Sequence, residues 1–408
     1  MKRWCAPLAG CLAAACAIGQ PAVPLQAFVA GDLATVHEFA VREAVEGAEE
    51  NLALVRNVQA QCEMLLGDID EARRHFEDAA TIMGNWAVSG GEATAAIVGS
   101  ESSKTYKGDP YEKAMNAFYV GLCYLWKGEP DNARAACKRG ILMDAEIGDE
   151  RFQADNALLF WMAGRMSALM GSDEAEGYYR EATTAHAFAI EHGARGEADN
   201  PVLQHAGDGN LVLVLECGMG PEKYGDGAQE ELARFRPRPH PAVAARVTLD
   251  GRDLGVASLM LDVDYQARTL GGTEMEGIRK GKAVFKTAST VAGAVLLSQS
   301  VNTGGNTGRT QAIVGGSLLL AGLLTSAGAD VRHWPTLPST VHVLTVQVPP
   351  GDHEFDVDFL AGGGQPLPGL RQHAKVTVPE EGEAWYLCRS LPPAPEPPPA
   401  PEEAPAPR

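Results

Sequence analysis

The chain has 408 residues, enough for two or three domains, and its composition of 45% hydrophobic and 21% charged residues is typical of globular proteins. A formal net charge of −19 at pH 7 argues against nucleic-acid binding, because phosphates require a basic surface. The same charge disfavours electrostatic docking onto anionic lipid.

Residues 1–23 have the pattern of a secretory signal. Lys2 and Arg3 give a basic start, and a largely apolar run follows. Bacterial lipoproteins are cleaved and lipidated at a cysteine preceded by small residues, and Cys16 and Cys11 are both candidates. Ordinary signal-peptidase cleavage is the alternative. We therefore predict export, and a lipidated protein would lie on the periplasmic side of the outer membrane.

Residues 111–127 and 130–141 are predicted to form the clearest helical hairpin of the chain. Apolar residues recur at three- and four-residue steps in the first segment and give it one broad apolar face. Gly128 suits the left-handed backbone at a helix end, and Pro130 suits the first turn of the next helix. Ala133 is small, so the second helix can approach the first closely.

The turn and second helix of this hairpin recur on both sides of it. Each copy places a small residue, a larger one and another small one at steps of four and three. The three sets are Ala72, Phe76 and Ala79; Ala133, Cys137 and Gly140; and Ala175, Tyr179 and Ala182. Such repetition is typical of tetratricopeptide-repeat (TPR) arrays. We therefore predict a TPR-like helical domain over residues 28–193, with residues 85–109 as an insertion.

Tyr106, Tyr111 and Glu112 lie at the start of the hairpin, and two interpretations are open. In a structural role they begin the helix, where an acidic group favours the N-terminus. In a functional role they line the concave groove of the array. Aromatic residues often contact partners on such faces, so these three residues and Tyr124 are candidates for binding a partner segment.

After a predicted linker at residues 194–209, strand patterns replace helical ones. Residues 210–217 are apolar at consecutive positions, so we expect both faces of that strand to be covered. Further strands are predicted at residues 243–249, 256–263, 340–348, 354–359, 376–378 and 384–388. Asp250-Gly251 is a hairpin-turn signal between the first two of these. Together they predict a small antiparallel β domain over residues 210–391, with Phe355, Phe359, Trp385 and Leu387 as its core.

An apolar, glycine-rich insertion at residues 275–329 interrupts the strands. Its second arm, residues 310–329, carries no charge and is about 20 residues long, which is the length of a membrane span. One interpretation is a helical hairpin buried against the sheet. A membrane hairpin over residues 287–329 is the alternative, although its first arm contains polar side chains that are costly in lipid.

Residues 392–408 consist mostly of Pro, Ala and Glu and are predicted to form a disordered, polyproline-like tail. The tail could dock into a groove or remain solvated. The predicted fold class is therefore α+β: an N-terminal TPR-like helical array, then a small antiparallel β domain with an inserted apolar helical hairpin.

Three motifs carry a resemblance to a known family. They are Tyr106-x-Gly108-x-x-Tyr111-Glu112, Gly218-x-Gly220-Pro221-x-Lys223 and Asp330-x-Arg332-x-Trp334-x-x-Leu337-Pro338. On these motifs the chain resembles an uncharacterised family of bacterial TPR lipoproteins with a C-terminal β-rich domain. The resemblance implies an envelope location and assigns no catalytic residue.

The third motif also has a physical interpretation. Asp330 and Arg332 can form an ion pair that positions the start of the sheet. Trp334 can anchor the crossover. Leu337-Pro338 favours extended backbone before a strand.

No pattern in the sequence points to catalysis, a cofactor or a metal. The ten histidines form no HExxH motif, there is no GxSxG elbow, and the glycine-rich residues 304–308 lack the lysine of a P-loop. Five cysteines follow the signal without CxxC spacing, and a Cys123–Cys137 bridge is left open. We therefore predict that the protein is not an enzyme and needs no cofactor.

The predicted function is a non-catalytic, exported and lipid-anchored scaffold of the bacterial envelope. Its partners would be other envelope proteins or peptide segments, together with the membrane through the lipid anchor, and not nucleic acid. The alternative is a membrane-inserting or pore-associated component that uses residues 287–329. A third hypothesis, a cell-wall hydrolase, lacks a recognisable pair of catalytic carboxylates.

Overall fold

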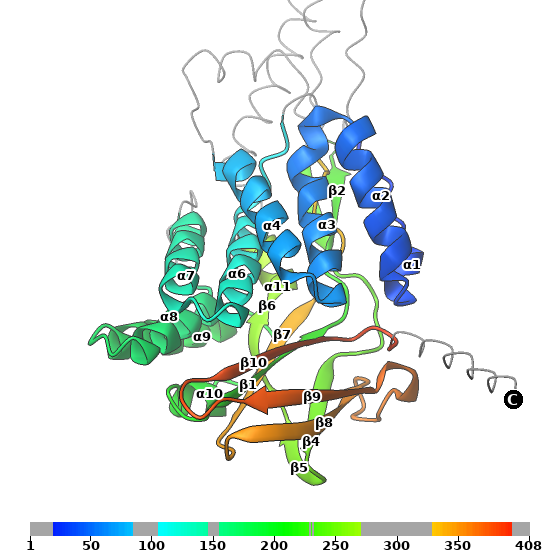
Figure 1. The fold of residues 1–408 in the computed structure, drawn as a ribbon. Helices are drawn as coiled ribbons and strands as arrows, with labels where there is room; N and C mark the ends of the chain where they lie inside the picture. Colours follow the sequence, from blue (N-terminus) through cyan, green and yellow to red (C-terminus); the bar gives the residue numbers. More distant parts are fainter. Residues whose placement is uncertain are drawn as a thin grey trace, which may run out of the picture.

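The computed structural model describes residues 19–84, 105–145, 155–227, 230, 232–270 and 329–393. Most helices precede the strands along the chain, and the fold belongs to the α+β class, as predicted (Figure 1). Several predictions fall outside the described residues. They concern lipidation of Cys11 or Cys16, most of the 85–109 insertion, the apolar hairpin within 275–329 and the tail beyond residue 393.

The helical half consists mainly of three consecutive helix pairs. They are α3 (Leu52–Leu66) with α4 (Ile69–Gly84), α6 (Pro110–Trp126) with α7 (Pro130–Ala145), and α8 (Ala157–Leu169) with α9 (Ala175–Glu191). Before them come α1 (Leu25–Val29), α2 (Leu33–Glu46) and the 3-10 helix η1 (Glu49–Asn51). The helices predicted at 111–127 and 130–141 are confirmed as α6 and α7. Gly128 follows α6 with a φ of 72°, the left-handed backbone that its position predicts.

Small residues mark the places where these helices approach most closely. A Cβ added at Gly140 of α7 would lie 2.8 Å from the Cβ of Ala117 in α6 and 2.7 Å from Cδ1 of Leu159 in α8. A Cβ added at Gly121 would lie 3.4 Å from the Sγ of Cys137. The predicted role of small residues at helix contacts is therefore confirmed for α7.

In the described part of the chain, the strands form two four-stranded sheets and a two-stranded ribbon. The first sheet is β10 (Ala384–Arg389), β1 (Leu211–Cys217), β7 (Thr340–Val346) and β6 (Ser258–Asp262), in that order. The second is β5 (Arg252–Val256), β4 (Ala244–Leu249), β8 (Gly351–Leu360) and β9 (Gln372–Val378). The ribbon pairs β2 (Glu222–Asp226) with β3 (Leu232–Arg236). The short helices α10 (Pro201–Gln204), α11 (Val263–Leu270) and η4 (Pro368–Leu370) complete the described elements.

Two details of the β prediction need correction. The β half is not purely antiparallel, because β10 pairs with β1 in parallel, although β7 is antiparallel to both β1 and β6. The Asp250-Gly251 turn joins β4 to β5, with φ values of 48° and 78° that suit a tight hairpin. The strand predicted at residues 256–263 is instead β6, which belongs to the other sheet.

The first sheet is the middle of three layers, between the helices and the second sheet (Figure 1). Val212 and Val214 of β1 belong to the apolar core shared with the helices. The alternate residues Leu213 and Leu215 belong to the core between the two sheets. Successive side chains of a strand point to opposite faces, so the prediction that both faces of this strand are covered is confirmed. Phe355 and Phe359 lie between the sheets, whereas Trp385 and Leu387 face the helices.

The covering sheet explains why α3, α6 and α8 are buried along most of their length. Residues 194–209, predicted as a linker, contain α10 and bury Leu203 in the same core. Among the described helices, none is both long and apolar enough to cross a membrane. Residues 287–328 of the predicted hairpin are not part of that statement, since they lie outside the described ranges.

Candidate functional site

The three sequence motifs meet at one place, which we call the motif junction: Asp109, Glu112, Lys223, Asp330 and Arg332. The Nζ of Lys223 lies 2.6 Å from Oδ2 of Asp109. Burial opposes the lysine cation, but the charges of Asp109 and Asp330 raise its pKa overall. The junction therefore joins the N-terminus of α6 to the segment that precedes β7.

Glu112 holds two backbone segments together at this junction. Its Oε2 accepts the N–H of Asp109 at 2.7 Å, and its Oε1 accepts the N–H of Trp334. The carboxyl group is fully buried. Burial, helped by the charge of Asp109, raises the pKa of Glu112 to about 7.

The predicted pairing of Asp330 with Arg332 is confirmed. The Nη2 of Arg332 lies 2.7 Å from Oδ2 of Asp330, and its Nη1 donates to Asn51 Oδ1 at 3.0 Å. The guanidinium also stacks over the ring of Tyr106, 5.7 Å from its centroid. This motif therefore ties the residues before β7 to the start of α3.

The proposed partner contacts on an open groove are not supported for three of the four candidate residues. Tyr106 and Tyr111 are each 2% exposed and Glu112 is fully buried, so these side chains cannot reach a partner in this structure. Tyr111 packs edge-on against Phe235, with ring centroids 5.7 Å apart. Tyr124 keeps some exposed surface, and its hydroxyl donates to Glu77. The burial of Tyr106, Tyr111 and Glu112 fits their structural interpretation, because the chain covers this face itself.

The predicted anchoring role of Trp334 is also confirmed. Its ring lies 5.9 Å from Phe76 and 5.6 Å from Tyr119, centroid to centroid. Its Nε1 donates to Thr336 at 2.9 Å, and Leu337 of the same motif is fully buried. Pro338 lies two residues before β7, and Trp334 fixes this crossover on the helices.

Sequence reasoning missed a buried ion pair in the first sheet. Arg389 of β10 lies 2.9 Å from Glu216 of the adjacent β1, and the hydroxyl of Tyr119 donates to the same carboxylate at 2.6 Å. Both charged side chains are almost completely buried. Glu216 and Arg389 each end an apolar run, and a charge at such a position needs a partner. The sequence did not show which residue that partner would be.

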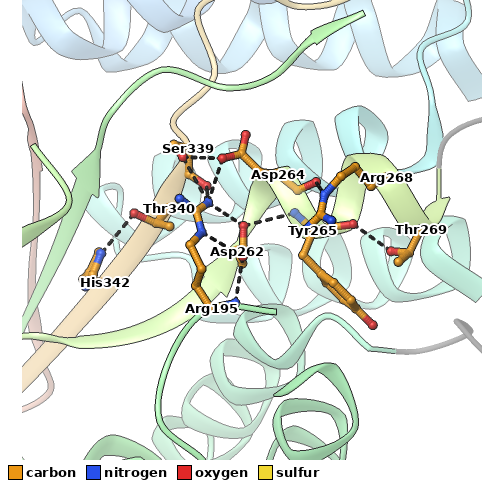
Figure 2. Close-up of polar contacts among 9 residues, drawn as sticks. All are labelled: Arg195, Asp262, Asp264, Tyr265, Arg268, Thr269, Ser339, Thr340 and His342. Carbon is orange, nitrogen blue, oxygen red and sulfur yellow. Dashed lines mark hydrogen bonds and ion pairs between the residues drawn. The ribbon is translucent and has the colours of Figure 1, made fainter. Parts of the chain in front are cut away.

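A second polar cluster surrounds Arg195, in the segment between α9 and α10 (Figure 2). Its Nη2 donates to Asp262 at 2.6 Å, to Asp264 at 2.8 Å and to the Oγ of Ser339 at 3.0 Å. Asp262 also accepts the N–H of Tyr265 at 3.0 Å, at the start of α11. The cluster thus joins the end of β6, the start of α11 and the residue before β7.

The two carboxylates in Figure 2 respond differently to the same surroundings. Burial would raise the pKa of Asp262, but hydrogen bonds and charge from Arg195 hold that pKa below its usual value. Burial raises the pKa of Asp264 in spite of Ser339 and Arg195. The neighbouring cavity measures only about 10 Å³, room for roughly one water molecule, so the cluster is a structural clamp. Asp262 ends β6 and Asp264 lies in the first turn of α11, so the two carboxylates span the corner between these elements.

One cavity of ligand size opens beside α1, and we call it the α1 cleft. Its volume is about 610 Å³, within the range of small-ligand and peptide sites. The walls come from Leu25 and Val29 of α1, from Met219, and from residues 238–241 and 367–370. Three distant parts of the chain therefore build one largely apolar surface.

Arg238 supplies the charge in this cleft. Its Nη1 donates to the carbonyl of Pro335 at 2.7 Å, and its Nη2 lies 2.8 Å from Nε2 of His333. Burial lowers the pKa of His333 to about 4, so this imidazole is neutral at pH 7. Glu222, the carboxylate of the wall, already pairs with Arg236 at 2.9 Å. Among the described residues, Arg238 thus has neutral hydrogen-bond partners. Burial lowers the pKa of Arg238 overall, although the nearby charge of Glu222 opposes this shift.

The described residues give no support for a metal site. No group of three or more His, Cys, Asp or Glu side chains in them is arranged to hold a metal ion. Cys123 and Cys137 are free thiols, so the bridge left open by the sequence is not formed.

Comparison with known proteins does not place the chain in a family. A scan against protein-family models finds no matching family, and a search of curated proteins finds no match. The resemblance to TPR lipoproteins therefore stays a prediction that depends on the three motifs.

Proposed function

We propose that the protein is a non-catalytic scaffold of the bacterial cell envelope that binds a protein segment in the α1 cleft. The observation that carries this proposal is the open cavity of about 610 Å³ with walls from three parts of the chain. Apolar walls favour binding because they remove apolar surface of the partner from water. Arg238 would orient the bound segment through an acidic or carbonyl group.

The helical half would act as a TPR-like array whose inner face holds the rest of the same chain. Three helix pairs with short turns and closely packed small residues support this interpretation. Trp334 and the first sheet occupy the face that an open array would offer to a partner. A partner would therefore bind at the edge of the array, where α1 lines the cleft.

Two valines give a matched test of the cleft. Val29 lines it and is 36% exposed, whereas Val45 on α2 is 81% exposed and lies outside it. We expect Val29→Gln to reduce recovery of bound partners from envelope extracts about tenfold, which corresponds to roughly 1.4 kcal/mol. Val45→Gln should leave recovery unchanged. Equal recovery with both variants would refute the cleft as the binding site.

Envelope anchoring is tested separately. We expect labelled fatty acid to be incorporated into the full chain and lost when the lipidated cysteine, Cys16 or Cys11, is replaced by Ala. Labelling that survives both replacements together would exclude these sites. Turnover of any cell-wall substrate in a panel of purified reactions would overturn the non-catalytic assignment.

A further inference from the structure

The last described residues bring the C-terminal part of the chain to the α1 cleft. Leu391 is buried in the core shared with the helices, and its carbonyl accepts the Nε2 of Gln372 at 2.9 Å, close after the 367–370 wall. The carbonyl of Pro392 lies against Gly31, just beyond α1: a Cβ added there would be 2.8 Å from it. In Figure 1 the red end of the described chain emerges between α1 and the orange loop that precedes β9. Two walls of the cleft therefore flank this point.

The chemistry of the cleft favours an apolar ligand that carries a carboxylate. Its walls are mainly aliphatic and proline side chains. Arg238 adds a partly buried cation, and the hydrogen-bond partners described above for it are neutral. Glu222 in the same wall attracts this cation but is itself paired with Arg236, so a further carboxylate near Arg238 would lower the free energy of the site.

The segment that follows has this chemistry. Residues 394–408 are mostly Pro and Ala, with carboxylates at Glu396, Glu402 and Glu403. Glu396 comes three residues after the last described residue. At about 3.1 Å per residue, a polyproline backbone of this length would reach about 45 Å, more than the cleft requires. Proline-rich segments also lose little conformational freedom on binding.

We propose that residues 394–408 bind in the α1 cleft of their own chain and place a glutamate beside Arg238. This inference rests on the proposed role of the cleft. The segment then occupies the partner site from within the chain, so a partner must displace it. The partner's apparent affinity falls in proportion to the fraction of molecules in which the cleft is free. Because the segment is tethered, its effective concentration at the cleft is high.

Site-specific photo-crosslinking in the full-length chain tests the proposal. A photoreactive amino acid at Ala400 should crosslink to α1, residues 238–241 or residues 367–370, as mapped by mass spectrometry. The same group at Glu381, in the exposed turn before β10, should not crosslink to these walls. Mixing isotope-labelled and unlabelled copies distinguishes crosslinks within one chain from crosslinks between two.

Two variants make the result specific. Val29→Gln should reduce the wall crosslinks at least fivefold, and so should replacement of Glu396, Glu402 and Glu403 together by Lys, since cations would then face Arg238. Val45→Gln should leave them unchanged. Crosslinks spread without preference for the walls, or unaffected by both variants, would overturn the proposal. Crosslinks found only between labelled and unlabelled copies would assign the cleft to a second chain instead.

The two proposals can fail independently. If the crosslinks miss the cleft while Val29→Gln still abolishes partner recovery, the cleft binds a partner but not residues 394–408. If the crosslinks behave as expected while partner recovery does not depend on Val29, the segment binds the cleft and the partner site lies elsewhere.

Discussion

Two lysine–carboxylate pairs in this protein have the same geometry in opposite surroundings. Lys223 and Asp109, in the motif junction, are 2.6 Å apart with side chains 8% and 10% exposed. Lys375 and Glu354, on the outer face of β9 and β8, are also 2.6 Å apart, but their side chains are 71% and 55% exposed. Distance therefore says little about what each pair contributes, because water screens the outer pair and not the inner one.

The inner pair belongs to a set of contacts that fix how the helices meet the sheet. Each charge there has several partners, and loss of one leaves another charge buried in an apolar interior. Water can replace the contact of the outer pair with little change in the free energy of unfolding. We expect the motif junction to specify one arrangement of the layers and the outer face to contribute mainly to solubility.

The largest predicted effect is that of Lys223→Met. The substitution keeps the aliphatic length of the side chain and removes its charge, so Asp109 is left without its cation. Breaking a buried pair in this way costs about 3–5 kcal/mol of unfolding free energy. Urea denaturation followed by circular dichroism measures the loss.

A second substitution shows whether the unpaired charge is the cause. Asp109→Asn removes the negative charge and still offers an oxygen to cap α6. We expect the double variant to be more stable than Lys223→Met alone. A double variant that is less stable would contradict this explanation.

Glu112→Gln is the next largest change, and it should alter the pH dependence of stability. A glutamine has one acceptor oxygen, so either Asp109 or Trp334 loses the acceptor of its N–H, at a cost of about 1–3 kcal/mol. Because the pKa of Glu112 is raised from 4.5 to about 7 on folding, its protonation stabilises the folded state. That contribution is complete below about pH 4.5 and is lost as the pH rises through 7.

The deficit of Glu112→Gln relative to the unmodified chain should therefore be larger at pH 5 than at pH 8. Urea denaturation of both proteins at the two pH values measures it, and other titrating groups largely cancel in the difference. A deficit independent of pH would show that Glu112 does not titrate in this range.

Local and long-range features of the fold also differ in how well the sequence predicted them. Both ends of α6 and the start of α7 were predicted to within one residue, because Gly128 and Pro130 are local signals that act on neighbouring backbone. The end of α7 was predicted four residues too early, at 141 in place of Ala145. The parallel pairing of β10 with β1 was missed, because no local pattern relates Glu216 to Arg389.

The same limit explains the errors in the candidate site. Tyr106 and Tyr111 were recognised as important, but their cover comes from residues far along the chain, so their burial could not be seen. The α1 cleft could not be predicted either, since its walls come from regions more than 300 residues apart at the extremes. The strand predicted at residues 256–263 ran one residue into α11, because so short a pattern does not separate the end of a strand from the start of a helix.

Smaller effects are expected from two glycine-to-alanine substitutions in the helices, one at a closely packed position and one at an open position. Gly140→Ala places a Cβ 2.8 Å from that of Ala117, which cannot move aside, so overpacking should outweigh the gain in helix propensity by about 1–2 kcal/mol. Gly177 of α9 is partly exposed, and an added Cβ there would meet only Arg180 at 4.0 Å. Gly177→Ala should therefore stabilise the protein by about 0.5–1 kcal/mol. Thermal denaturation measures the change in stability of both variants. Stabilisation by Gly140→Ala would contradict the close contact with Ala117.

The smallest effect is predicted for Lys375→Met, the same substitution as at Lys223 but in the exposed pair. Its ammonium is fully exposed, and Glu354 can exchange it for water without desolvation. We expect the urea midpoint of this variant to match that of the unmodified chain within error, at both low and high salt. A loss of unfolding free energy comparable to that of Lys223→Met would mean that the exposed pair on β8 and β9 also holds the layers together. In that case the contrast between screened and buried pairs would not explain the stability of this fold.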